Sequence, residues 1–76
     1  AHLARQDRQR ERIYRVYDYL VAGAPGSLDA TFRLWWEQAE TDAARDRAII
    51  DQIASMTESR LERLAQRSAE LFGFLS

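Results

Sequence analysis

Residues 50–60 read Ile-Asp-Gln-Ile-Ala-Ser-Met-Thr-Glu-Ser-Arg, or IDQIASMTESR. The first half of this stretch has the spacing of an amphipathic helix as far as Ser55. Thr57, Glu58 and Ser59 then follow, which are residue types that begin helices, because a hydroxyl oxygen can accept from the free N–H groups of a first turn. We predict that Met56 ends the apolar stripe of one helix and that Thr57 or Ser59 caps the next. The chain would then bend sharply without a loop.

Two helices are expected before this pair. The first spans about residues 5–22, because apolar side chains recur at i, i+3, i+4, i+7 and i+8. Those residues are Ile13, Val16, Tyr17, Leu20 and Val21. Gly23 is expected to supply a left-handed cap, and Pro25 cannot continue the helix. The second helix spans about 28–40 and is capped by Ser27 or Asp29. Its apolar face contains Leu28, Phe32, Trp35, Trp36 and Ala39.

The last two helices flank the opening stretch. Thr41 followed by Asp42 predicts the start of a helix over about 42–56, with a capping hydroxyl and an acidic first turn. A helix over about 58–72 follows, in which Ser59 and Glu62 have the spacing of a capping box. Gly73 is a natural end for it.

The fold class that follows is all-α, with three to four helices and short connections in one helical unit over 1–76. A chain of this length buries only about 60% of the surface that its unfolded form exposes, so its own core is marginal. No disulfide can add stability, because the chain has no cysteine. We therefore expect the unit to depend on a partner, which is either another copy of the chain or the rest of a larger protein.

Few catalytic chemistries fit this composition. His2 is the only histidine, and there is no cysteine pair, phosphate-binding glycine loop or nucleophile elbow. The carboxylates of Asp42, Asp46 and Asp51 are expected to be solvated, since no loop supplies further oxygen ligands. We predict no catalytic, cofactor-binding or metal-binding residue in this chain by itself.

Charge argues against a membrane or nucleic-acid partner. The net charge is −1, and no apolar run approaches the roughly 20 residues that cross a bilayer. The first predicted helix has arginines along one side, at positions 5, 8, 12 and 15, which could contact phosphates. Because Asp7, Glu11 and Asp18 are interleaved with them, a solvated helix face is the favoured interpretation.

Trp35 and Trp36 point about 100° apart on their helix, so at least one ring is expected to meet a partner surface.

The stretch from Asp51 to Glu58 resembles a segment near the C-terminal end of deoxyguanosine triphosphate triphosphohydrolases (dGTPases) and dGTPase-like proteins of the HD phosphohydrolase superfamily. The matching positions are Asp51, Ile53, Ala54, Ser55, Met56 and Thr57. Glu58 replaces the usual aspartate, and Gln52 stands where an aromatic residue is frequent. The preceding run AARDRAIIDQIA, residues 43–54, also fits the order expected before the motif.

This resemblance implies a hydrolase that cleaves dGTP to deoxyguanosine and triphosphate with a divalent metal. The metal ligands of the family lie in upstream helices, so no catalytic residue is carried over. The resemblance implies instead a structural role for Asp51, Met56, Thr57 and Glu58 in a segment that packs on the catalytic helices of its own chain. It also implies that the chain is a C-terminal fragment, a sub-region of a larger all-α enzyme that forms a homo-oligomer. The lack of cysteine fits a reducing, cytoplasmic compartment.

Two other hypotheses remain open. The chain could be an autonomous helical interaction module that self-associates through a Trp35 and Trp36 interface. It could also contact phosphates or a nucleic-acid backbone through the arginines, although nucleic acid is the weaker expectation.

Overall fold

The computed structural model describes residues 2–73, and the side chains of residues 7–73. That part of the chain contains four helices and no strand: α1 (His2–Gly23), α2 (Ala30–Gln38), α3 (Asp42–Ala54) and α4 (Glu58–Gly73). The predicted all-α class is confirmed.

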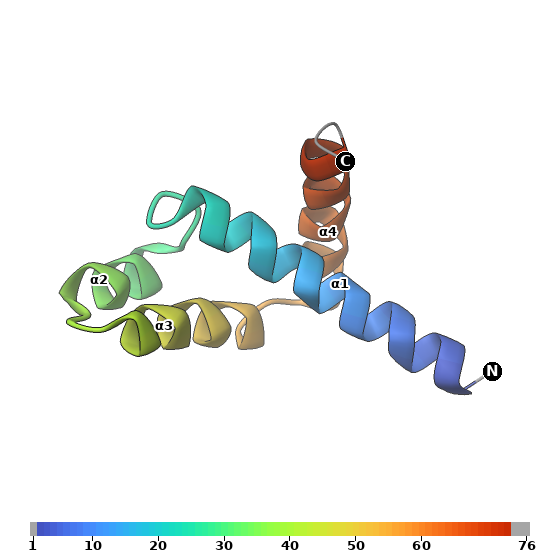
Figure 1. Ribbon diagram of the computed structural model, residues 1–76, viewed down its shortest axis with the longest axis horizontal. Coiled ribbons are helices and arrows are strands. Elements are labelled where there is room, and N and C mark those ends of the chain that lie inside the picture. The colour runs from blue at the N-terminus through green and yellow to red at the C-terminus, as the bar shows by residue number, and fades with distance from the viewer. Residues whose placement is uncertain (1, 74–76) are drawn as a thin grey trace.

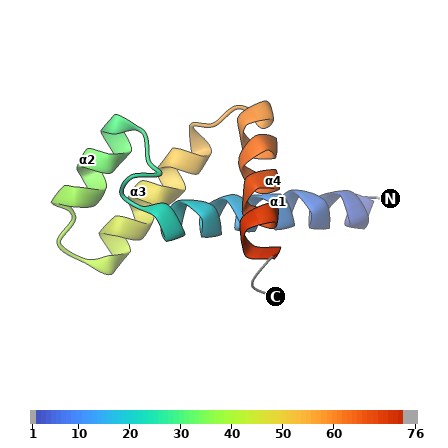
Figure 2. The ribbon, with the colours of Figure 1, turned by 90° about the horizontal axis from the view of Figure 1, so that it is seen from above.

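The helices are arranged around α1, which is the longest (Figures 1 and 2). α2 and α3 form an antiparallel pair beside the C-terminal half of α1, and α4 crosses α1 near its middle. The packed pairs are α1 with α4, α2 with α3, and α1 with α3. The first turns of α1 extend past α4, which gives the molecule its long dimension of 42 Å.

A small core lies where these helices meet. Its buried members are Val16, Leu20, Leu28, Ile49, Leu61 and Ala65. They come from α1, the α1–α2 connection, α3 and α4, whereas α2 has no fully buried residue. α2 packs only partly buried rings, Phe32 and Trp36, against this core. The core is therefore built mainly by three helices and one connection.

The structure places the ends of α2 differently from the expected 28–40. Leu28 is 1% exposed and lies in the connection, where its N–H donates to Pro25 O at 3.1 Å. Asp29 has extended backbone (φ −67°, ψ 159°), so α2 begins at Ala30. At the other end Ala39 is also extended (φ −67°, ψ 135°), which ends the helix at Gln38. Leu28 is therefore buried from the connection, outside the helix in which its place in the apolar stripe predicted it.

Two other local expectations need correction. Among the described glycines none has a positive φ, so Gly23 is not a left-handed cap. Instead Gly23 O accepts from Ser27 N–H at 3.1 Å, and the Ser27 hydroxyl donates to Leu20 O at 2.7 Å. α3 ends at Ala54 rather than at residue 56, and Met56 lies in the short connection to α4.

Candidate functional site

Thr57 caps α4 at the corner that the opening stretch predicts. Its Oγ1 accepts from the backbone N–H of Arg60 at 3.2 Å, and its carbonyl oxygen accepts from Leu61 N–H at 3.0 Å. Because α4 begins at Glu58, Ser59 is inside the first turn, and the expected capping box of Ser59 with Glu62 does not form. Met56 is half-buried against the core. The connection between α3 and α4 is only residues 55–57.

A polar network, formed by Asp29, Gln52 and Arg60, holds this corner against the α1–α2 connection. Gln52 is fully buried; its Oε1 accepts from Asp29 N–H at 2.6 Å, and its Nε2 donates to Asp29 Oδ2 at 3.0 Å. Arg60 donates to both carboxylate oxygens of Asp29, at 2.8 and 2.7 Å. Asp29 occupies the N-cap position of α2 without a side-chain cap bond, because its carboxylate is committed to this network.

The charges of this network stabilise one another. The hydrogen bonds from Arg60, then those from Gln52, lower the pKa of Asp29 from 3.8 to about 2. The hydrogen bond with Asp29 raises the pKa of Arg60. Both groups therefore stay charged across the physiological pH range. Such a bidentate pair adds directional specificity to the contact between segments 31 residues apart.

Glu58, a motif position, joins α4 to α1. Its Oε2 accepts from Arg12 Nη2 at 2.6 Å, and Glu62 lies 3.5 Å from the Arg12 Nη1 atom. The hydrogen bond with Glu58 is the main cause of a raised pKa at Arg12. Glu58 is 82% exposed, so this ion pair is a surface contact of small energy. It lies where the two helices cross, and buried Val16, Leu20, Leu61 and Ala65 form the apolar contact between them.

The three carboxylates considered for a metal have other partners. Asp42 pairs with Arg45, Asp46 accepts from the Tyr17 hydroxyl, and Asp51 Oδ1 lies 3.1 Å from Arg47 Nε. Within the described residues no group of three or more His, Cys, Asp or Glu side chains is placed to hold a metal ion. The His2 side chain lies outside the described side chains.

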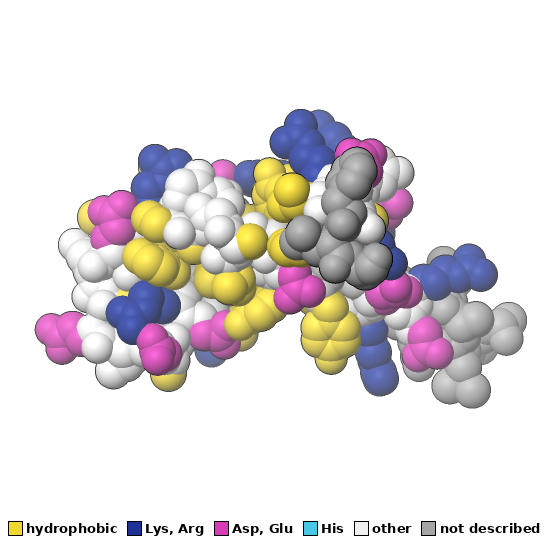
Figure 3. Space-filling view, turned by 45° about the horizontal axis from the view of Figure 1, so that its top comes forward, with side chains coloured by type: hydrophobic (Ala, Val, Ile, Leu, Met, Phe, Trp, Pro, Cys, Tyr) yellow, Lys and Arg dark blue, Asp and Glu magenta, His cyan; other side chains and the backbone are white. Residues whose placement is uncertain are grey.

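The two tryptophans have different environments. Trp36 packs against the core, with the Arg45 guanidinium 5.9 Å from its ring. Trp35 is 47% exposed; it contacts Phe32 edge-on at 5.3 Å and borders a shallow groove between α2 and α3 that Asp51 also lines. The fold thus brings a motif residue and a candidate interface residue to one surface. Figure 3 shows hydrophobic side chains among the charged ones on one face of the molecule.

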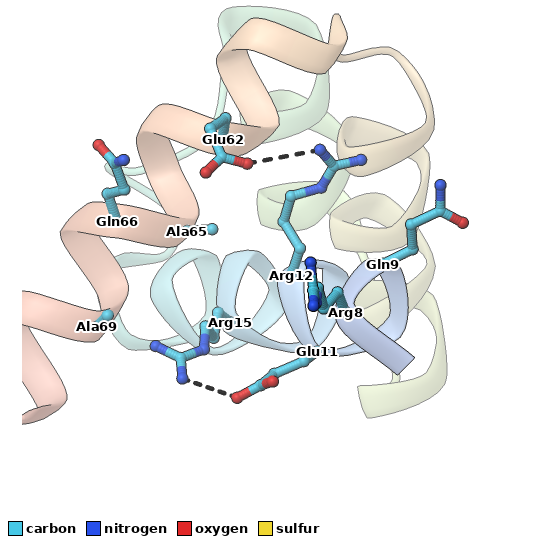
Figure 4. A pocket seen from close by; sticks show the side chains of 9 residues that line it. All are labelled: Arg8, Gln9, Glu11, Arg12, Arg15, Glu62, Ala65, Gln66 and Ala69. Carbon is cyan, nitrogen blue, oxygen red and sulfur yellow. Dashed lines mark hydrogen bonds and ion pairs between the residues drawn. The ribbon is translucent and has the colours of Figure 1, made fainter. Parts of the chain in front are cut away.

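A larger open groove, of about 390 Å³, lies between the N-terminal half of α1 and α4 (Figure 4). Arg8, Arg12 and Arg15 line it from α1. Glu62, Ala65, Gln66 and Ala69 line it from α4. The predicted arginine stripe is therefore in part a groove wall rather than only an open helix face. The side chain of Arg5 lies outside the described side chains.

Sequence reasoning missed Gln52 and Arg60 as members of the corner. One signal was available for Gln52: it falls at i+3 from Ile49, on the apolar stripe that continues to Ile53 and Met56. A polar side chain on a buried stripe requires hydrogen-bond partners. The sequence gives no comparable indication for Arg60, because an arginine in the first turn of a helix is normally expected to be exposed.

Fold and site together define a small all-α unit in which hydrogen bonds hold α3 and α4 to the α1–α2 connection. Residues 1–67 match the family described as a phosphohydrolase-associated domain, and the chain belongs to this family. The resemblance noted in the sequence is confirmed by relatives named deoxyguanosinetriphosphate triphosphohydrolase-like protein. The chain is 73% identical over 74 residues to the one from Corynebacterium diphtheriae, and 39% identical over 59 residues to one from Streptomyces coelicolor.

These alignments cover 97% and 78% of the chain, but only 18% and 14% of the two relatives. A relative from Corynebacterium efficiens is 65% identical over 74 residues, again 97% of the chain and 17% of the relative. The chain thus spans less than a fifth of the length of the curated relatives it matches. No solved structure matches it. None of the described helices combines the length and the apolar character needed to cross a membrane.

Proposed function

We propose that this chain is a non-catalytic helical segment, at the C-terminal end, of a metal-dependent dNTP triphosphohydrolase that converts dGTP to deoxyguanosine and triphosphate. The names of the relatives support the reaction, and the small share of their length that the chain covers supports a part in a larger protein. Its role there is to pack on the catalytic helices and to aid subunit contacts in a homo-oligomer. The lack of cysteine fits a reducing, cytoplasmic location.

The observation that carries this proposal is that several large apolar side chains remain exposed to solvent in this fold. The exposed residues are Ile13, Tyr14, Val21, Leu34, Trp35, Ile50 and Leu71. They lie on α1, α2, α3 and α4, so every helix offers a surface that further protein can cover. These side chains are about half exposed, so covering the exposed part adds roughly half of the about 1.5–3 kcal/mol that complete burial yields. A marginal core of six residues needs this contribution.

The described part of this chain offers no binding site for the divalent metal of the proposed reaction. No suitable group of ligands is present there, and Asp42, Asp46 and Asp51 are bound to other side chains. The proposal therefore assigns metal binding to the remainder of the larger protein. It assigns no reaction step to any residue described here.

The test is turnover of dGTP with Mg²⁺ or Mn²⁺ by the purified 76-residue chain, with the full-length Corynebacterium diphtheriae relative assayed beside it. We expect triphosphate release by the relative and none above the buffer blank by the chain. Release by the chain that disappears on Asp46→Asn or Asp51→Asn would overturn the non-catalytic role. An inactive relative would overturn the proposed reaction.

A second candidate function is a self-associating helical module, and the exposure of Trp35 favours it. Tryptophan is enriched among the residues that dominate binding interfaces. This function predicts a melting temperature that falls on dilution, because association stabilises the folded form by mass action. A melting temperature that stays constant over a hundredfold dilution would rule it out.

A further inference from the structure

α1 carries a second apolar stripe beside the one that it turns to the core. Tyr14, Tyr17 and Val21 have the i, i+3, i+7 spacing of a single helix face. Tyr14 is 66% exposed and Val21 is 46% exposed, and Tyr17 between them is partly buried. None of the three lines the groove between α1 and α4. The described part of the chain therefore leaves most of this stripe uncovered.

α3 extends the apolar surface, because it packs on α1 next to the stripe. The Tyr17 hydroxyl donates to Asp46 of α3, which brings the two helices together at this point. Since α1 and α3 run in opposite senses (Figure 1), Ile50, one turn after Asp46, lies on the same side of this contact as Tyr14, one turn before Tyr17. Ile50 is 47% exposed. We call the surface formed by Tyr14, Tyr17, Val21 and Ile50 the α1–α3 face.

The α1–α3 face has an apolar middle and a charged rim. The Tyr17 hydroxyl is already bound to Asp46, and the exposed Tyr14 hydroxyl can reach water from the end of its side chain. Arg10 and Asp18, one turn on either side of Tyr14, border the stripe. A strand laid on this face would bring backbone groups that need partners, whereas an α-helix satisfies its own. The face therefore suits the apolar side of an amphipathic helix.

The lengths of the relatives favour another part of the same polypeptide as the source of that helix. Two of them align with 97% of this chain, yet the aligned segment is only 17–18% of their length, so more than four-fifths of each lies outside this unit. A segment that is joined covalently to the unit competes for the face at an effective concentration of the order of millimolar. It would therefore cover the face before a second copy does.

We propose that the α1–α3 face docks an amphipathic helix from the part of the polypeptide outside these 76 residues. The apolar side of that helix covers Tyr14, Val21 and Ile50. This inference rests on the proposed place of the chain in a larger protein, and it adds which face makes the contact. The Trp35 surface on α2 is not part of it.

The test is thiol labelling of single-cysteine variants, because the chain has no cysteine of its own. The protein is the Corynebacterium diphtheriae relative in which this chain replaces the aligned segment, to which it is 73% identical. Tyr14→Cys and Ile50→Cys report the face from α1 and from α3. Arg63→Cys, at an exposed position of α4 outside the face, is the matched control. The same variants of the 76-residue chain give the rates without the rest of the protein.

The rate of the unsubstituted protein is subtracted, and circular dichroism checks that each variant is helical. We expect Tyr14→Cys and Ile50→Cys to react at least about tenfold more slowly in the larger protein than in the isolated chain, and Arg63→Cys less than about twofold more slowly. Unchanged rates at both face positions, or equal slowing at all three positions, would overturn the proposal. Slowing that disappears on hundredfold dilution would also overturn it, because the occupant would then be a second copy.

Turnover of dGTP by the unsubstituted larger protein is measured beside the labelling, so that the two proposals fail separately. Slow labelling of the face in an inactive protein would contradict the proposed reaction and support the docking. Fast labelling of the face in an active protein would contradict the docking alone.

Discussion

Gln52 shows how a single polar side chain can organise this fold. It is completely buried, and it accepts from the backbone of Asp29 while donating to the carboxylate of the same residue. A third contact, to Ser55 Oγ at 3.5 Å, is long. A buried polar group is tolerated only when such bonds are made, so Gln52 specifies the position of the α1–α2 connection against α3.

Replacing Gln52 tests this role. In Gln52→Leu the Asp29 N–H loses its acceptor, and we expect the free energy of unfolding to fall by about 1–3 kcal/mol. Urea denaturation followed by circular dichroism measures it. Gln66→Leu, an exposed position, is the control and should stay within about 0.5 kcal/mol. A Gln52→Leu protein as stable as the unsubstituted chain would show that the network adds nothing.

Asp29 gives the corner a pH dependence at the acidic end. The pKa of Asp29 is lowered in the folded state from 3.8 to about 2. The ionised carboxylate therefore adds to the free energy of unfolding above pH 4, and this addition is lost as the pH falls from about 4 to about 2. The full shift corresponds to about 2 kcal/mol, but the side chain is 47% exposed, and solvent screening reduces this to about 1 kcal/mol or less.

The comparison is with Asp29→Asn, which cannot ionise. The difference in unfolding free energy between the two proteins, measured by urea denaturation, should be largest near pH 6 and should shrink by pH 2. A difference that stays constant over this interval would mean that Asp29 ionisation does not stabilise the fold.

At the residue scale the sequence predicted the capping role of Thr57 but not the pairing of Arg60. A hydroxyl residue after an apolar stripe is a recognisable cap, because the N–H groups that it can accept from are three residues away. Arg60 instead pairs with Asp29, a residue 31 positions earlier, and nothing local indicates that partner.

Among the elements, α4 depends most clearly on its first turn. Thr57 Oγ1 accepts from Arg60 N–H, whereas Ser59 lies within the helix and is exposed. We expect Thr57→Ala to cost about 0.5–2 kcal/mol of stability and Ser59→Ala to be near neutral. Thermal or urea unfolding of the two variants separates the alternatives that the sequence left open. Equal losses, or a larger loss in Ser59→Ala, would contradict the observed cap.

The period of the apolar residues located the helices well, but it misplaced the beginning of α2. Leu28 continues the α2 stripe in sequence, yet it is buried in the connection because Asp29 is drawn to Gln52 and Arg60. A tertiary contact therefore decides where α2 begins. The left-handed cap expected at Gly23 does not form, and the Ser27 hydroxyl instead donates to Leu20 O.

For the whole molecule, stability rests on few side chains. Leu20 is 0% exposed in a core cluster of six, so Leu20→Ala should lower the free energy of unfolding by about 2–5 kcal/mol. In a chain of 76 residues such a loss is a large part of the total. Leu34→Ala, which removes a 51% exposed side chain, is the control and should have little effect on the isolated chain. Similar losses in both variants would mean that Leu20 is not in a packed core.

At this scale the all-α class followed from the sequence, because helical periodicity met no competing strand pattern. The crossing of α4 over α1 and the groove between them did not. Their position depends on which side chains pair across the chain, as Arg12 does with Glu58 and Glu62.

The central claim is that this helical unit is part of a larger phosphohydrolase, and its most direct test is the natural reading frame. Sequencing the gene upstream of the Ala1 codon measures the length of protein that precedes this chain. The proposal predicts several hundred residues there, with histidines and a His-Asp pair followed by a further aspartate. A start codon immediately before Ala1 would contradict the claim.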